Sequence, residues 1–146
     1  MVPMSRRTLA LILLTLGGLS ALGFGIYGLV SPAATAAAVS LEPQNAFGRG
    51  EIRALYGGMW TAMGVLVFGA LRQLASRGAP RPAVDTRATE RIRTIALCWT
   101  GVPLARGLAT LLDGSDGGPA GLFILAEVAM VATLLGGLAL LPARRA

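Results

Sequence analysis

Four apolar segments run through this chain, and each is about as long as a helix that crosses a lipid bilayer. They are Thr8–Val30, Ala54–Leu71, Ile95–Leu112 and Pro119–Leu141. A helix needs about 20 apolar residues to span the hydrocarbon core. Charged residues make up only 14% of the chain, whereas a soluble domain carries about 25%. The chain is therefore predicted to be all-α, an integral membrane four-helix bundle that forms one domain over residues 1–146.

The arginines predict the orientation of this bundle. All 13 basic residues are arginine, and loops rich in basic residues stay in the cytoplasm. With four spans, ten arginines fall on the side of the two termini: Arg6, Arg7, Arg72, Arg77, Arg81, Arg87, Arg91, Arg93, Arg144 and Arg145. Both termini are therefore predicted to be cytoplasmic, in a bacterial inner membrane. A cleaved signal peptide over the first segment is the alternative, but its apolar run extends to Val30 and favours an uncleaved helix.

Composition argues against several classes of function. The chain has one cysteine, Cys98, and no histidine. One thiol cannot form an intramolecular disulfide or a CxxC redox pair, and histidine is the commonest ligand for haem, zinc or copper. The arginines flank apolar segments, so nucleic-acid binding is not expected. We expect no cofactor and no metal, and no nucleophile–base pair supports an enzyme.

The connections between the spans differ in character. The first, residues 31–50, is predicted to be external and to begin with a short interfacial helix over Pro32–Leu41, because proline is favoured at a helix start. In the second, a new helix is predicted from Asp85, where Glu90 lies three residues from Arg87 and from Arg93. That spacing is typical of helical ion pairs. The third connection, residues 113–118, is a tight turn rich in glycine.

Charges inside the spans mark a candidate site. Arg106 lies seven residues before Asp113 and Glu127 eight residues after Pro119, so both lie roughly 10–12 Å below the same surface. Arg53 and Tyr56, at the mouth of the second span, reach toward this level. Charges at such a depth are costly and usually face a partner. We expect Arg106 and Glu127 to be in contact.

Two interpretations of this cluster stay open. In the first, the ion pair only fixes the packing of the helices. In the second, an outward-facing pocket lined by Arg53, Tyr56, Arg106, Asp113 and Glu127 binds an anionic or zwitterionic head group. Trp60 and Trp99 are expected to be packing residues. The many small residues of the spans are expected to let helices approach closely.

A longer motif resembles a known family. The segment Glu51–Met59, which reads EIRALYGGM, is followed by Ala62 and Gly64, and later by Ala105-Arg106, Asp113-Gly114 and Glu127. These residues, in this order, are similar to the signature of small bacterial four-span membrane proteins grouped as domain of unknown function 4345. The resemblance covers most of the chain from Glu51 onward. It implies a four-helix membrane fold and a shared polar site, and it implies no activity.

Three classes of function follow. The favoured one is a membrane protein whose buried polar cluster binds a lipid-like or anionic ligand, or supports a membrane partner. The alternative is a small proton-coupled transporter that uses Glu127, although a nearby Arg106 would keep Glu127 ionised. An enzyme acting on lipids is third. Membrane lipid is the expected partner, and a second copy of the chain or another membrane protein are further candidates.

Overall fold

In the computed structural model, residues 4–39, 41–42, 45–76, 82–113 and 118–141 are described, those at 82–85, 113 and 118–120 by their backbone only. Every element in these ranges is helical. They are α1 (Arg6–Val30), α2 (Pro32–Ala38), α3 (Ala46–Ile52), the π-helix η1 (Arg53–Met59), α4 (Trp60–Ala75), α5 (Pro82–Asp113) and α6 (Gly118–Leu140). The predicted all-α class is confirmed.

Four helices are long and apolar enough to cross a membrane. They cover Arg6–Val30, Ala46–Ala75, Thr86–Leu112 and Gly121–Leu140. Each contains most or all of one segment predicted from the sequence. The second is longer than predicted, because α3, η1 and α4 follow one another without a break. The fold is therefore that of a multi-pass membrane protein.

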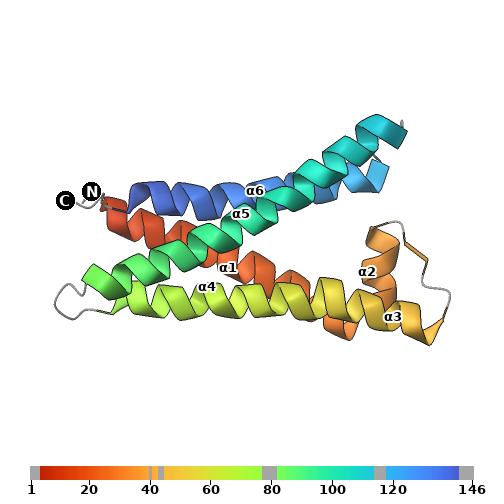
Figure 1. Cartoon of the computed structure of the whole chain (residues 1–146), viewed down its shortest axis with the longest axis horizontal. Coiled ribbons are helices and arrows are strands. Elements are labelled where there is room, and N and C mark those ends of the chain that lie inside the picture. The colour runs from red at the N-terminus through yellow and green to blue at the C-terminus, as the bar shows by residue number, and fades with distance from the viewer. Residues whose placement is uncertain (1–3, 40, 43–44, 77–81, 114–117, 142–146) are drawn as a thin grey trace.

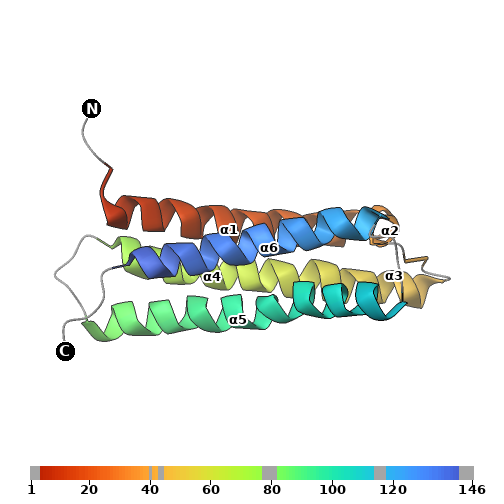
Figure 2. The ribbon, with the colours of Figure 1, turned by 90° about the horizontal axis from the view of Figure 1, so that it is seen from above.

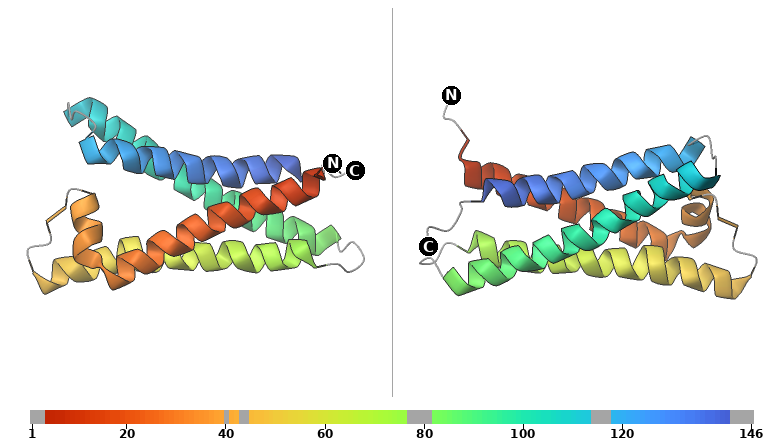
Figure 3. Two further views of the ribbon diagram at one scale, coloured as in Figure 1. Left: turned by 180° about the vertical axis from the view of Figure 1, so that it is seen from behind. Right: turned by 45° about the horizontal axis from the view of Figure 1, so that its top comes forward.

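The four long helices pack side by side. Helix α1 contacts α4 and α6, and helix α5 contacts the same two helices. Figure 1 and Figure 2 show the start of α1, the end of α4, the start of α5 and the end of α6 at one end of the molecule. The other end carries α2 and α3, and it is called the α2–α3 end below. Toward that end, α5 and α6 diverge from α3 and α4 (Figure 3).

Glycines bring α1 very close to the second span. A Cβ added at Gly25 would collide with the backbone nitrogen of Thr61, and one added at Gly28 would lie 2.9 Å from the nitrogen of Gly57. At Gly64, an added Cβ would lie 2.8 Å from the nitrogen of Leu22. Small residues permit this backbone contact between helices in lipid. The predicted role of small residues in packing is confirmed here.

The apolar core receives large side chains from all four long helices. The fully buried ones are Leu14 of α1, Val67 of α4, Ile92 and Trp99 of α5, and Leu134 of α6. Gly17 and Gly137 let α1 and α6 meet tightly beside Leu134 and Leu14. This part of the molecule is a closely packed seam, and the candidate site lies nearer the α2–α3 end.

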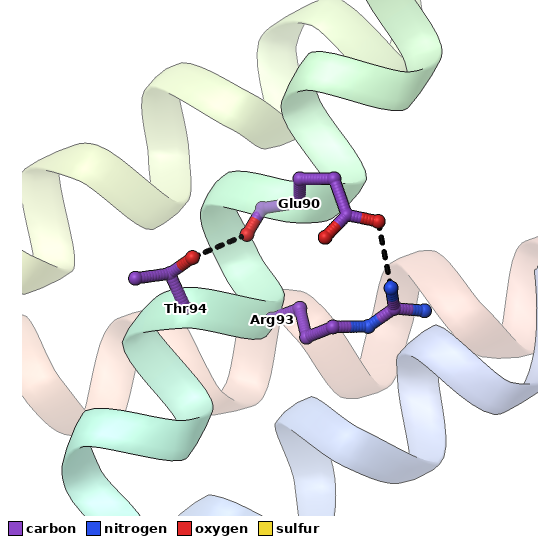
Figure 4. A network of polar contacts seen from close by, with 3 residues as sticks. All are labelled: Glu90, Arg93 and Thr94. Carbon is purple, nitrogen blue, oxygen red and sulfur yellow. Dashed lines mark hydrogen bonds and ion pairs between the residues drawn. The ribbon is translucent and has the colours of Figure 1, made fainter.

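Two further predictions on the connections are confirmed. The helix predicted after α1 is the short helix α2, which begins at Pro32 as expected and ends at Ala38, before the predicted Leu41. On α5, Arg93 Nη1 lies 2.6 Å from Glu90 Oε1, while Thr94 Oγ1 donates to the carbonyl of Glu90 (Figure 4). Both charged side chains are 54% exposed, so this pair contributes little to stability. It lies near the start of the apolar stretch Thr86–Leu112 of α5.

Candidate functional site: an ion pair beside an aromatic cavity

The predicted contact between α5 and α6 is confirmed. Arg106 Nε lies 3.1 Å from Glu127 Oε1, and this hydrogen bond is also an ion pair. The Glu127 side chain is 3% exposed and that of Arg106 is 22% exposed. An ion pair that is largely removed from water needs further partners to repay its desolvation. The surroundings of the two side chains therefore decide what the pair does.

Four aromatic rings, one from each long helix, form a series of contacts that begins at the pair. Arg106 Cζ lies 6.0 Å from the ring centroid of Phe123, within the range of cation–π attraction. Phe123 contacts Phe24 of α1 at 5.7 Å between centroids, and Phe24 contacts Trp60 of α4 at 4.6 Å. Trp60 in turn contacts Trp99 of α5 at 4.9 Å. This aromatic cluster, Phe24, Trp60, Trp99 and Phe123, joins all four spans next to the ion pair.

A cavity of about 230 Å³ lies against the aromatic cluster. Its lining comes from α1, α4 and α6: Ser20, Phe24, Trp60, Leu122, Phe123, Ala126, Glu127 and Met130. Most of this lining is apolar. Ser20, Leu122 and Ala126 are exposed, so the cavity opens sideways between α1 and α6. Glu127 and Trp60 are buried and form its inner wall.

One side-chain atom of the cavity-lining residue Glu127 has an unmet hydrogen-bonding capacity. Glu127 Oε2 is buried and has no hydrogen-bond partner within the described part of the chain. Burying a charged oxygen without a partner is costly, and each such group in a native structure calls for an explanation. Ser20, at the mouth, already donates its hydroxyl hydrogen to the carbonyl of Leu16 at 2.9 Å. The cavity therefore has apolar walls, and one of its lining residues holds a buried acceptor that lacks a donor.

Arg53 and Tyr56, the predicted site residues of the second span, do not lie beside the ion pair or the cavity. Arg53 is exposed, and its Nε donates to the carbonyl of Leu29 at 3.2 Å, at the end of α1. A cation suits that end of a helix, where carbonyls lack partners. Tyr56 is half-buried, and its backbone lies against Gly28. Neither residue lines the cavity, and Trp60 takes that position from the second span.

The remaining predicted site residue is Asp113. It is the last residue of α5, and its side chain lies outside the described residues. Of the five predicted site residues, the structure therefore brings together Arg106 and Glu127. It puts Arg53 and Tyr56 at the contact between the end of α1 and η1.

Sequence reasoning missed the residues that shape the cavity. Phe123 precedes Glu127 by four residues, so the two share a face of α6, and this spacing could have revealed it. Trp60 was assigned to packing, which its contact with Trp99 supports, yet it also lines the cavity. Phe24 and Ser20 lie on a span without charges, and nothing in the sequence distinguishes them from other lipid-facing residues.

The π-helix was also missed. Its seven residues, Arg53–Met59, coincide with most of the motif EIRALYGGM. Short π-helical turns occur often at functional sites. Here the turn brings Gly57 against Leu29, so close that an added Cβ would lie 2.7 Å from Leu29 Cδ2. The motif thus forms the contact with the end of α1.

Comparison with known proteins identifies the family. No curated protein and no solved structure matches the chain. The family model described as domain of unknown function (DUF4345) matches residues 9–138, which include all or most of each of the four long apolar helices. Arg53, Tyr56, Arg106, Asp113 and Glu127 all lie within the matched segment. The chain belongs to the DUF4345 family.

Proposed function

We propose that this protein is a bacterial inner-membrane protein that binds a lipid-like molecule in the cavity between α1 and α6. The observation that carries the proposal is a mostly apolar cavity with a buried carboxylate on its inner wall. Ligand sites are typically apolar with a few placed polar groups. Because α1 and α6 are both long enough to span a bilayer, the mouth at Ser20, Leu122 and Ala126 would face lipid.

The side chains at the mouth support entry from the membrane. Leu122 is 73% exposed, and Ala126 is small. A hydrophobic molecule in the bilayer would meet no polar barrier before it reached Phe24 and Phe123. The ion pair behind these rings would then contact its polar end.

A variant with a filled cavity tests this proposal. Ala126→Leu adds bulk at the mouth, whereas Ala129→Leu adds the same bulk to an exposed position of α6 that does not line the cavity. We expect hydrophobic molecules that copurify with the wild type to be retained by Ala129→Leu and lost from Ala126→Leu. Native mass spectrometry of the three proteins measures this. Equal retention by both variants would contradict binding in this cavity.

The proposal includes an orientation with both termini in the cytoplasm. In a four-span chain, ten of the arginines lie on the same side of the membrane as the two termini. The positive-inside rule places that side in the cytoplasm. The start of α1 and the end of α6 lie at the same end of the molecule, as expected for a chain that crosses the membrane an even number of times (Figure 1). Reporter fusions after Arg145 and between residues 44 and 48 are expected to give opposite signals. Identical signals would rule out the four-span threading.

Proton-coupled transport through Glu127 is the second candidate. The unpartnered Oε2 of a cavity-lining carboxylate favours it, because carboxylates inside a membrane often serve as proton relays. The contact with Arg106 argues against it, since a guanidinium in contact with a carboxylate opposes protonation of that carboxylate. The test is uptake of a substrate, driven by a proton gradient, into liposomes that contain the purified protein. Uptake that is abolished in Glu127→Gln would favour transport over binding alone.

A further inference from the structure

The chemistry of the cavity narrows the class of ligand. Resting on the proposed function, we infer that the ligand is a neutral amphiphile whose polar end is a hydrogen-bond donor, foremost a hydroxyl group, accepted by Glu127 Oε2. Three observations support this inference: the unpartnered oxygen of Glu127, the balance of charge between Glu127 and Arg106, and the size of the cavity.

The unpartnered oxygen defines what the polar end must supply. Glu127 is 3% exposed and lines the cavity, and Oε1 is already engaged by Arg106. Oε2 has no donor among the described residues. An ionised carboxylate can only accept hydrogen bonds. A ligand group without an O–H or N–H would leave this oxygen without a partner.

The charge balance decides between a neutral and a charged donor. Arg106 and Glu127 cancel each other's charge, so a neutral polar end leaves the cavity neutral. An anionic end would be repelled by Glu127 Oε2 in a medium of low dielectric constant, where such repulsion is strong. A cationic end would be attracted by Oε2 and by the rings of Phe24 and Trp60. It would also be repelled by the Arg106 guanidinium, which lies next to the same carboxylate.

The cavity is large enough for the polar end and too small for a whole lipid. An engineered apolar cavity of about 150 Å³ holds benzene, and drug-sized ligands occupy about 300–1,000 Å³. At about 230 Å³, this cavity holds the polar end and the adjoining part of an apolar body. The remainder would leave between Ser20 and Ala126 and lie along the surface of α1 and α6.

Native tryptophan fluorescence tests the head-group preference. The chain has two tryptophans: Trp60 lines the cavity, and Trp99 lies 4.9 Å from it between ring centroids. The probes are three amphiphiles with the same brominated alkyl chain, ending in a hydroxyl, a carboxylate or a trimethylammonium group. Bromine quenches tryptophan on contact. The protein is held in vesicles of neutral lipid, and quenching is recorded against the mole fraction of each probe.

We expect the alcohol to quench at about tenfold lower mole fraction than either charged probe, the effect of one added hydrogen bond. The double variant Arg106→Leu/Glu127→Leu removes both charges and leaves the aromatic walls. Replacement of a buried ion pair by apolar residues is often tolerated. In this variant, which lacks the accepting oxygen, the mole fraction of the alcohol needed for quenching is expected to rise about tenfold. Ala126→Leu measures the quenching that arises from the surrounding lipid alone.

The outcomes distinguish failure of the hydroxyl preference from failure of binding in the cavity. If the three probes quench the wild type equally and Ala126→Leu abolishes this quenching, the cavity binds amphiphiles and the hydroxyl preference is wrong. A preference for the carboxylate or the ammonium probe overturns it as well. If Ala126→Leu leaves quenching by all three probes unchanged, the cavity does not bind them, and the proposed function fails together with the inference.

Discussion

The two sides of α1 pack in opposite ways near the α2–α3 end. On one side, Gly25 and Gly28 bring the backbone of α1 against Thr61 and Gly57 of the second span. Beside this contact, the adjacent Phe24 places its ring between Trp60 of α4 and Phe123 of α6 and lines a cavity. A single helix therefore carries a stretch of direct backbone contact and a stretch held apart by rings. The first leaves no room for a ligand, and the second leaves about 230 Å³.

The contact between α1 and α6 also changes from close to open packing along its length. Farther from the α2–α3 end, Gly17 lies against Leu134 and Gly137 against Leu14, and the two helices meet closely. Near the α2–α3 end, Phe24 and Phe123 replace glycine at the contact, and the ion pair lies there too. The cavity thus occurs where large rings and charges take over from small residues.

The largest effect is expected from a side chain added at the tight contact. Gly25→Val would place Cβ and two methyl groups against the backbone of Thr61, so α1 and α4 would have to separate. We expect a loss of at least about 3 kcal/mol in the free energy of unfolding, since overpacking against backbone cannot be relieved by a rotamer change. Titration with denaturing detergent measures this.

The matched control lies two residues earlier on the same helix. Nothing lies within 4 Å of a Cβ added at Gly23. Gly23→Val is expected to leave the free energy of unfolding nearly unchanged. If both variants lose the same stability, the difference between the two sides of α1 does not arise from packing.

A smaller, asymmetric effect is expected at the ion pair. Arg106→Gln leaves the carboxylate of Glu127, which is 3% exposed, without its cation, and we expect a loss of about 3 kcal/mol. Glu127→Gln leaves the more exposed Arg106, whose long side chain can reach a polar surface. We expect about 2 kcal/mol for that change. Unfolding titrations of both variants would show the order, and a reversed order would contradict the deeper burial of Glu127.

The smallest effect is expected at Arg53. Its hydrogen bond to Leu29 lies on the exposed surface, so Arg53→Ala is expected to cost about 0.5 kcal/mol, the usual contribution of a cation at a helix end. Quenching by the brominated alcohol should be unchanged, because Arg53 does not line the cavity. Arg49→Ala, on the exposed surface of α3, is the control. Weaker quenching in Arg53→Ala alone would support the ligand-binding role predicted from the sequence.

The sequence predicted what depends on length, periodicity and the cost of charge. The four spans follow from apolar length, and the contact of Arg106 with Glu127 follows from depth, because two opposite charges at one level in lipid have few other partners. The Glu90–Arg93 pair followed from helical spacing. These inferences needed only distances along a single helix or a shared depth.

The remaining features depend on how each helix is rotated about its axis. Depth alone placed Arg53 and Tyr56 near the ion pair, but the π-helix and the backbone contact with α1 direct Arg53 to the carbonyl of Leu29. Phe24 has no polar neighbour that could mark its role. Its position beside the cavity depends on Gly25 facing α4, which is a property of the packed molecule.

The π-helix has a consequence for insertions and deletions in this family. A π-turn contains one residue more than the α-helical turn that it replaces, and one residue corresponds to about 100° of rotation in an α-helix. Deletion of a single residue within Arg53–Met59 would therefore keep the span helical and turn α3 about its axis relative to α4. Gly57 and Arg53 could then no longer meet α1 while Trp60 remains in the cavity wall. Homologous chains that retain both contacts should have the same length across this turn, even where their loops differ.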